Sequence, residues 1–288
     1  MPDPLRQVRR WAAGFLPVRG LRRPAEAPLR LFEAGYLTRR RGVDPGALVF
    51  AAVDLETTGL DPVGDRVCEI AVVRFRGDGT VLGEFASLLD PGRPMGATEI
   101  HGLDDALVRG APSFAEVLPQ IERMLVDAVV VAHNLAFEDA FLDAELRRCG
   151  REPASRPPGL CTLVTARAQL EGPGYGLAAL HRSMTAAPPA DPHSALGDAR
   201  STAALLSALL AQAPSPLRYA GPRPRPAKPA QDDPPVRAVP RPPRAAPDVA
   251  AEIAAPADDP HLLHHWRRRE LAPAWSRNGG TGRGAGTR

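Results

Sequence analysis

The chain has 288 residues, of which 44% are hydrophobic, and its formal net charge at pH 7 is +3. This length suits one large domain or two small ones with a buried core. No apolar run approaches a membrane span, the first 20 residues are too weakly apolar for a signal peptide, and the three cysteines form no zinc or disulfide pattern. We therefore expect a cytoplasmic protein.

The charge is distributed unevenly. Residues 1–47 carry ten Arg and four acids, and residues 213–288 carry thirteen basic residues and seven acids. Residues 48–212 carry thirteen Arg and twenty-two acids, a net charge of −9. An acidic centre with two basic arms suits a metal-dependent enzyme that meets a polyanion. Ordinary solvated tails, or a GC-rich coding sequence that favours Arg over Lys, would give the same pattern.

The first half of the chain predicts three strands. Residues 1–47 indicate no core of their own and at most a short helix near Leu29–Leu37. Strands are expected at Leu48–Val53, Val67–Arg76 and Thr80–Leu89, the last two joined by the hairpin signal Gly77-Asp78-Gly79. Three successive strands of this kind indicate an antiparallel meander.

The second half alternates helix and strand patterns. Helices are predicted at Ser113–Leu125 (despite Pro119), Phe137–Cys149, Cys161–Leu170, Leu177–His181 and Ala195–Gln212, and a short buried strand at Ala128–Ala132. Together with the meander, this order predicts a layered α+β or α/β fold with a mixed central sheet flanked by helices.

The C-terminal region differs in composition. Twelve prolines fall between Pro214 and Pro247, which predicts an extended, disordered arm, since proline lacks a backbone donor. Beyond it only His261–Leu271 looks able to order. Its histidines (His261, His264 and His265) have no cysteine or suitably spaced acid nearby and favour a solvated turn over a metal site. We expect a basic extension at 1–47, a catalytic domain at 48–212, and a Pro/Arg-rich, largely disordered tail at 213–288.

Two acids stand at the end of the first predicted strand. Asp54 and Glu56 are two residues apart, so in an extended segment both carboxylates face the same side. Two like charges held close repel each other unless a cation lies between them, and Mg²⁺ or Mn²⁺ prefers such oxygen ligands. The alternative is a strand end with a charged rim.

Two later stretches also carry polar side chains. His133-Asn134 follows the strand Ala128–Ala132 and leads into a helix with acids at Glu138 and Asp139. His193 and Asp198 then span a junction between a loop and a helix. Taken singly, acids in a first helical turn offset the helix dipole, and an isolated histidine is usually structural.

In combination, the order DxETTG, HNxxF-acid and HxALxD resembles the DEDD-type 3′–5′ exonuclease superfamily. More narrowly, it resembles the His-containing (DEDDh), DnaQ-like branch typified by the proofreading epsilon subunit of bacterial DNA polymerase III. The resemblance spans about residues 47–212. Lesser matches lie at Ile100-His101-Gly102 and at Cys161-Thr162-Leu163, where the family has Asp in place of Cys161.

The resemblance implies an RNase H-like fold and a two-metal mechanism with Mg²⁺ or Mn²⁺. By position, Asp54, Glu56, Glu138 and Asp198 would hold the metals and His193 would act as general base. Nucleoside 5′-monophosphates would leave one at a time from a single-stranded 3′ end. The residues implied to surround the terminal nucleotide are Thr57, Thr58, Gly59, His101, His133, Asn134 and Phe137.

One departure from the family pattern lies in the metal set. Glu138 stands where the family has Asp, and the extra methylene moves the carboxylate by about 1.5 Å, which disturbs a tight Mg²⁺ site. Glu138 could still reach the second ion, or Asp139 could replace it if the helix begins differently.

The sequence leaves the substrate and partners open. A proofreading subunit, a stand-alone DNA exonuclease and an RNA-trimming exonuclease all fit, as does a nuclease fold that only binds nucleic acid or acts as a scaffold. The tail shows no clamp-binding motif, but it could bind a DNA polymerase, another protein or nucleic acid.

Overall fold

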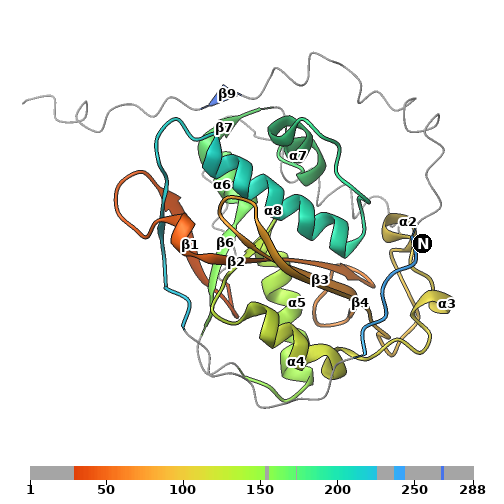
Figure 1. Ribbon diagram of the computed structural model, residues 1–288. Coiled ribbons are helices and arrows are strands. Elements are labelled where there is room, and N and C mark those ends of the chain that lie inside the picture. Colours follow the sequence, from red (N-terminus) through yellow and green to blue (C-terminus); the bar gives the residue numbers. More distant parts are fainter. Residues whose placement is uncertain (1–28, 153–155, 173, 226–236, 244–266, 269–288) are drawn as a thin grey trace, which may run out of the picture.

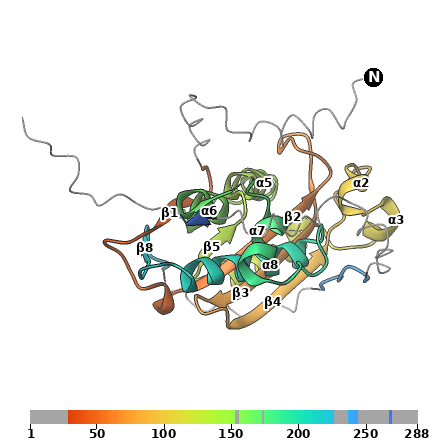
Figure 2. The same ribbon diagram turned by 90° about the horizontal axis from the view of Figure 1, so that it is seen from above.

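The computed structural model describes residues 29–152, 156–172, 174–225, 237–243 and 267–268. Most of them build a seven-stranded mixed sheet with helices on both faces (Figures 1 and 2). The predicted α/β architecture is confirmed. The N-terminal 28 residues and the three C-terminal histidines lie outside the described residues. Within the described part of the chain, no helix is long and apolar enough to cross a membrane.

The large sheet has the strand order β4-β3-β2-β5-β6-β1-β8. β3 is antiparallel to β2 and β4, the strands β2, β5, β6 and β1 run parallel, and β8 is antiparallel to β1. A small second sheet pairs β7 with β9. The strands are β1 (Glu33–Thr38), β2 (Val49–Thr57), β3 (Val67–Arg76), β4 (Val81–Leu88), β5 (Val129–Ala132), β6 (Pro158–Cys161), β7 (Leu170–Glu171), β8 (Arg218–Ala220) and β9 (Arg267–Arg268).

The predicted meander is confirmed, and β3 has the predicted bounds. At the hairpin, the Arg76 N–H donates to the Thr80 carbonyl at 2.9 Å, and Gly79 has a φ of 93°. A positive φ of this size favours glycine. The Gly77-Asp78-Gly79 signal therefore marked the turn correctly.

The predicted helices are also present, within a few residues of their expected ends. Ser113 caps α4 in a capping box with Glu116, which explains why the helix begins there, and the helix continues through Pro119. The helical segments are η1 (Pro45–Ala47), α2 (Thr98–His101), α3 (Asp105–Val108), α4 (Phe114–Leu125), α5 (Leu135–Arg148), α6 (Thr162–Gln169), α7 (Leu177–Thr185) and α8 (Ala195–Ala211).

The two faces of β2 carry two separate cores. Ala51, Val53 and Leu55 pack on the face covered by α4 and α5. Phe50 and Ala52 pack on the opposite face, which α8 covers with its alanine-rich side (Figure 1). β2 is thus buried on both sides along its first half, as expected for a central strand.

The helix predicted near Leu29–Leu37 is wrong. Residues Glu33–Thr38 form β1, which pairs in parallel with β6 and antiparallel with β8. Leu31 and Phe32 just before it are buried in the core. Local spacing could not show this, because the partners of β1 lie more than 100 residues further along the chain.

Part of the segment interpreted as disordered is also ordered. β8 completes the sheet as an edge strand, and Tyr219 on it is 1% exposed, packed among the residues of the α8 core. Gly35 makes room for it, since a Cβ there would lie 2.3 Å from the Tyr219 hydroxyl oxygen. Residues 237–243 are described as well. The limits of a 48–212 domain remain a prediction, although the sheet takes strands from both sides of that range.

Helix α5 is fixed to the sheet by a buried acid. Glu145 is fully buried and accepts from the Arg66 side chain at 2.7 and 3.0 Å and from the Val67 N–H at 3.2 Å. A buried carboxylate with several charged and backbone donors constrains the position of its helix. This pair sets α5 against the start of β3.

Substitutions at Tyr219 test the packing of β8. Its buried hydroxyl has no hydrogen-bond partner, so we expect Tyr219→Phe to leave the free energy of unfolding unchanged or higher. Tyr219→Ala should lower it by about 3–5 kcal/mol, because it opens a cavity in the core. Urea unfolding measures both; an unaffected Ala variant would contradict the packing of this strand.

Candidate metal and nuclease site

The carboxylates of β2 continue an apolar row. Phe50 and Ala52 point toward α8, and side chains alternate along a strand, so Asp54 and Glu56 face the same side. Both are half-buried. They lie where the apolar cover of the strand ends and the first turn of α8 begins.

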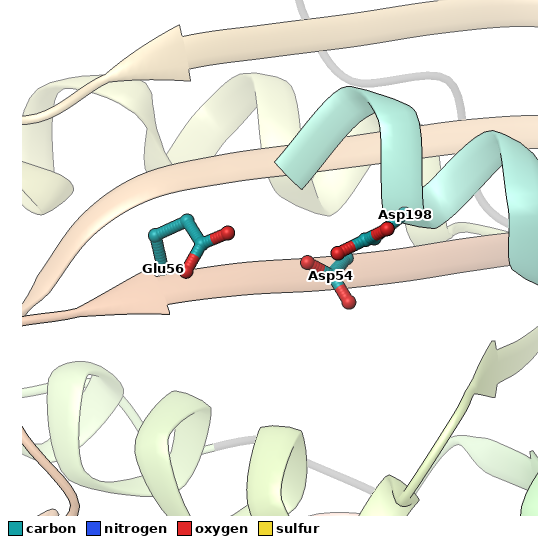
Figure 3. A group of neighbouring side chains, drawn as sticks. All are labelled: Asp54, Glu56 and Asp198. Carbon is teal, nitrogen blue, oxygen red and sulfur yellow. The ribbon is translucent and has the colours of Figure 1, made fainter. Parts of the chain in front are cut away.

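Asp198 comes from that first turn. Ser194 caps α8 by accepting from the Gly197 N–H at 3.1 Å, which fixes the start of the helix. Asp54, Glu56 and Asp198 each offer an oxygen, and these oxygens all lie within 4.8 Å of one another (Figure 3). Oxygen ligands so grouped can hold a hard divalent cation, although exposed acids also gather without one.

Burial and the neighbouring negative charges together set the electrostatics of Asp54. Burial raises the pKa of Asp54 well above its ordinary value, and so do the neighbouring charges of Asp198, Glu138, Glu56 and Glu69. Concentrated negative charge of this kind is costly without a compensating cation. The cluster of Asp54, Glu56 and Asp198 therefore favours a bound cation.

Glu138 stands at the edge of the cluster with an unused oxygen. It is the fourth residue of α5 and is 5% exposed, and its Oε2 has no hydrogen-bond partner among the residues that the structure describes. Burial raises the pKa of Glu138 to about 8. It is not among the three acids whose oxygens group within 4.8 Å, but its charge acts on Asp54. A buried carboxylate oxygen normally has a hydrogen-bond partner or a bound ion, so the Oε2 of Glu138 is a position at which a ligand could bind.

Asp139, the alternative ligand, is engaged elsewhere. Its carboxylate accepts from the backbone N–H groups of Arg30, Leu31 and Phe32 at 2.6, 3.0 and 2.8 Å. These bonds tie the segment before β1 to α5. The geometry therefore favours Glu138 over Asp139 as a metal ligand.

His193 lies in the loop before α8 and is exposed. Its backbone has a φ of 60°, a sparsely populated region, and its N–H donates to Asp198 Oδ2 at 3.2 Å. Gly197 lets this loop close on the helix, because a Cβ there would lie 2.1 Å from the Asp191 carbonyl oxygen. The structure thus joins His193 to Asp198 through the backbone.

The loop after β2 and the turn at His101 contact each other. The Thr57 hydroxyl donates to the Gly59 carbonyl at 2.6 Å, and Gly96 approaches the Thr58 carbonyl so closely that a Cβ would lie 2.3 Å away. His101 is buried; its Nε2 lies 3.1 Å from the Gly96 carbonyl, and its Nδ1 accepts from Leu103. Contact of these residues with a nucleotide stays a prediction.

The predicted substrate residues after β5 make contacts within the protein. His133 lies between the Thr162 hydroxyl, 2.9 Å from its Nδ1, and the Tyr175 carbonyl, 2.8 Å from its Nε2. Asn134 caps α5 with a φ of 118°, and the Phe137 ring centroid lies 4.8 Å from that of Phe141. Their role toward a substrate is untested.

Sequence reasoning missed two residues beside the cluster. Glu69 on β3 lies opposite Glu56 and is 1% exposed. Burial raises its pKa, and Arg241 opposes that shift. The sequence did contain a signal for Glu69, because an acid is unusual within the apolar strand VCEIAVV. It contained no such signal for Arg241, which lies in the proline-rich stretch.

The comparison with known families gives an assignment. The family described as Exonuclease (RNase T) matches residues 51–206, more than half of the chain. This α/β protein therefore belongs to the exonuclease family, and the resemblance to DEDD-type nucleases is confirmed.

Individual relatives agree with this family. The chain is 38% identical over 168 residues to a DNA polymerase III subunit epsilon-like protein of Rhodobacter capsulatus, covering 57% of this chain and 24% of the relative. It is 35% identical over 131 residues to the DNA polymerase III subunit epsilon of Treponema pallidum, covering 45% and 59%. The chain thus spans about a quarter of the first relative's length.

Solved structures show the same fold. E. coli exonuclease I, in complex with a dA16 oligonucleotide, superposes with a TM-score of 0.52 at 18% identity. The match covers 58% of this chain and 42% of that one. The predicted RNase H-like exonuclease fold is confirmed.

Substitutions separate the roles of the two adjacent acids of α5. We expect Asp139→Ala to lower the free energy of unfolding by about 2–4 kcal/mol, because three backbone donors lose a charged acceptor. Glu138→Gln breaks no hydrogen bond of the orphaned oxygen and removes a carboxyl group whose ionisation is disfavoured by burial, so the metal-free protein should be as stable or more stable. Urea unfolding of the metal-free protein measures both variants. A larger loss of unfolding free energy for Glu138→Gln than for Asp139→Ala would contradict these roles.

The pH dependence of stability should carry a contribution from His133. Burial lowers the pKa of His133 to about 4, so below about pH 6.5 the unfolded chain binds a proton that the folded one does not. This costs stability as the pH falls. From pH 7.5 to 5, the stability of the wild type should fall by about 1–2 kcal/mol relative to His133→Gln. If the difference in unfolding free energy between the wild type and His133→Gln stays constant over that pH range, the prediction is wrong.

Proposed function

We propose that this protein is a metal-dependent 3′–5′ exonuclease that releases nucleoside 5′-monophosphates from single-stranded or frayed 3′ ends of DNA. The observation that carries the proposal is the grouping of Asp54, Glu56 and Asp198 on an exonuclease-family fold. Residues 48–212 would form the catalytic domain, with β1 and β8 completing its sheet.

The residues present fit a pair of divalent cations. Three carboxylates supply oxygens within 4.8 Å of one another, and the orphaned Oε2 of Glu138 supplies a further acceptor at the edge of the group. Burial and the charges of the neighbouring acids raise the pKa of Asp54, and bound cations would neutralise those charges. Asp54, Glu56, Glu138 and Asp198 would hold Mg²⁺ or Mn²⁺.

The chemistry is hydrolysis of a terminal phosphodiester. Two bound cations would activate a water molecule and stabilise the leaving 3′ oxygen during in-line displacement at phosphorus. His193 would accept the proton of that water, since imidazole titrates near neutral pH. The bond from phosphorus to the 3′ oxygen breaks, and the terminal nucleotide leaves with its 5′-phosphate.

Single-stranded DNA is the proposed substrate. Support comes from relatives named for DNA polymerase III epsilon subunits and from a fold neighbour solved with an oligonucleotide. The terminal nucleotide must leave a duplex to reach a buried site. The same relatives support a DNA polymerase as a partner, for which the tail beyond residue 243 would be available.

The decisive assay uses 5′-labelled single-stranded DNA and RNA oligonucleotides with Mg²⁺ or Mn²⁺. The wild type should produce a ladder that shortens from the 3′ end of DNA. Asp54→Asn should lower kcat by about a thousandfold or more, because it removes a ligand worth several kcal/mol of transition-state stabilisation. Mn²⁺ should raise the Tm of the wild type but not of this variant.

Asp78→Asn is the matched control, since Asp78 is exposed in the β3–β4 turn. Asp78 Oδ1 accepts from the Thr80 N–H at 2.9 Å, a contact that the Asn oxygen can keep, so this variant should retain both the activity and the rise in Tm with Mn²⁺. Shortening from the 5′ end would refute the direction, and trimming of RNA alone would refute the substrate class. Binding without cleavage with either ion would favour a scaffold.

A further inference from the structure

A C-terminal segment returns to the nuclease sheet. Residues 237–243, blue in Figure 1, run beside β4 near α2. The Val239 N–H donates to the Ser87 hydroxyl at 3.0 Å, and the Leu88 N–H donates to the Val239 carbonyl at 2.7 Å. The Val239 side chain packs on the cluster of Cys68, Leu88 and Leu103. The segment is docked through its backbone and one apolar side chain.

Arg241 of this segment reaches three separate elements. Its Nη1 donates to Glu69 Oε2 at 2.8 Å and to the His193 carbonyl at 3.0 Å, and its Nη2 donates to the His101 carbonyl. Its side chain is 9% exposed and that of Glu69 is 1% exposed. One guanidinium therefore joins β3, the loop before α8 and the end of α2.

The same contacts reach the start of α8. Glu69 Oε2 also accepts from the Ala195 N–H at 3.3 Å, in the helix that carries Asp198 three residues later. Glu69 itself lies opposite Glu56 in the β2–β3 pair. The pair of Glu69 and Arg241 thus links the strand of Glu56 to the loop of His193 and the helix of Asp198.

Arg241 is poorly suited to bind a substrate phosphate. Its guanidinium is buried, and its named partners are a carboxylate and two carbonyls of the protein. Arg237, in the same segment, is exposed. The two arginines have equal charge but differ in burial and in contacts.

We propose that Arg241 is a positioning residue that holds the His193 loop and the His101 turn in fixed places relative to Asp54 and Glu56. The inference rests on the proposed nuclease function of His193. It also implies that the catalytic unit extends to about residue 243, beyond residues 51–206 matched by the exonuclease family. Residues 237–243 are then part of the active unit.

The test compares Arg241→Ala, Arg241→Lys and Arg237→Ala in the full chain. Activity is measured on a labelled oligonucleotide and on the p-nitrophenyl ester of thymidine 5′-monophosphate, which needs no long nucleic acid. Arg241→Ala should lower kcat about 10- to 100-fold on both substrates, with KM within about twofold, because a small displacement of a catalytic group is costly. Arg241→Lys should restore part of the loss, and Arg237→Ala should leave kcat unchanged.

Hydrogen exchange of the metal-free protein gives a readout that needs no activity. Arg241→Ala should speed exchange at the amides of Leu88 and Ala195, and Arg237→Ala should not. If Arg241→Ala does not fold, Arg241→Lys and Glu69→Gln carry the same comparison.

The outcomes separate the two proposals. If the wild type cleaves and Arg241→Ala is equally active on both substrates, the positioning role is refuted and the nuclease function stands. A rise in KM on the oligonucleotide alone would make Arg241 a binding residue and would also refute positioning. If the wild type cleaves nothing, the proposed function fails. Independently of activity, unchanged hydrogen exchange at the Ala195 amide in Arg241→Ala would refute the positioning role of Arg241.

Discussion

The central constraint in this structure is the confinement of like charges at the carboxyl end of β2. Asp54 lies among Glu56, Asp198, Glu138 and Glu69, which all raise its pKa. Like charges repel one another, so contacts from the surrounding structure must hold each carboxylate in place against that repulsion. The capped start of α8, the Glu145 anchor of α5 and the long pairing of β2 with β3 supply these contacts.

The layered architecture explains how distant segments meet there. β2 is central, so its α8 face carries Asp54 and Glu56 while α4 and α5 cover the other face. Within α5, successive residues are turned by about 100°, since a helix has 3.6 residues per turn. Glu138 and Asp139 therefore serve different neighbours. Glu138 has an oxygen without a hydrogen bond beside the cluster, and Asp139 accepts from three backbone amides of the segment before β1.

Much of this was readable from the sequence, and the failures have a common physical cause. Alternation placed Asp54 and Glu56 on one face, the hairpin signal placed the meander, and helical patterns placed α4 and α8. The missed features were β1, β8 and Arg241, each of which depends on partners far away in the chain. A strand of six residues next to Leu31 and Phe32 has no local pattern that excludes a helix. The choice between Glu138 and Asp139 depended in the same way on a segment more than 100 residues earlier.

The proline-rich segment shows how composition can mislead. Prolines exclude a helix and a central strand, but they also restrict the unfolded chain and so reduce the entropy lost when a peptide docks in an extended form. Pro240 and Pro242 flank Arg241 and offer no N–H, so the segment needs few backbone partners. It is fixed by the two backbone bonds of Val239 and by the guanidinium that neutralises Glu69. The basic charge of the tail was interpreted as a sign of nucleic-acid contact, but at Arg241 it compensates Glu69, a buried acid beside the cluster.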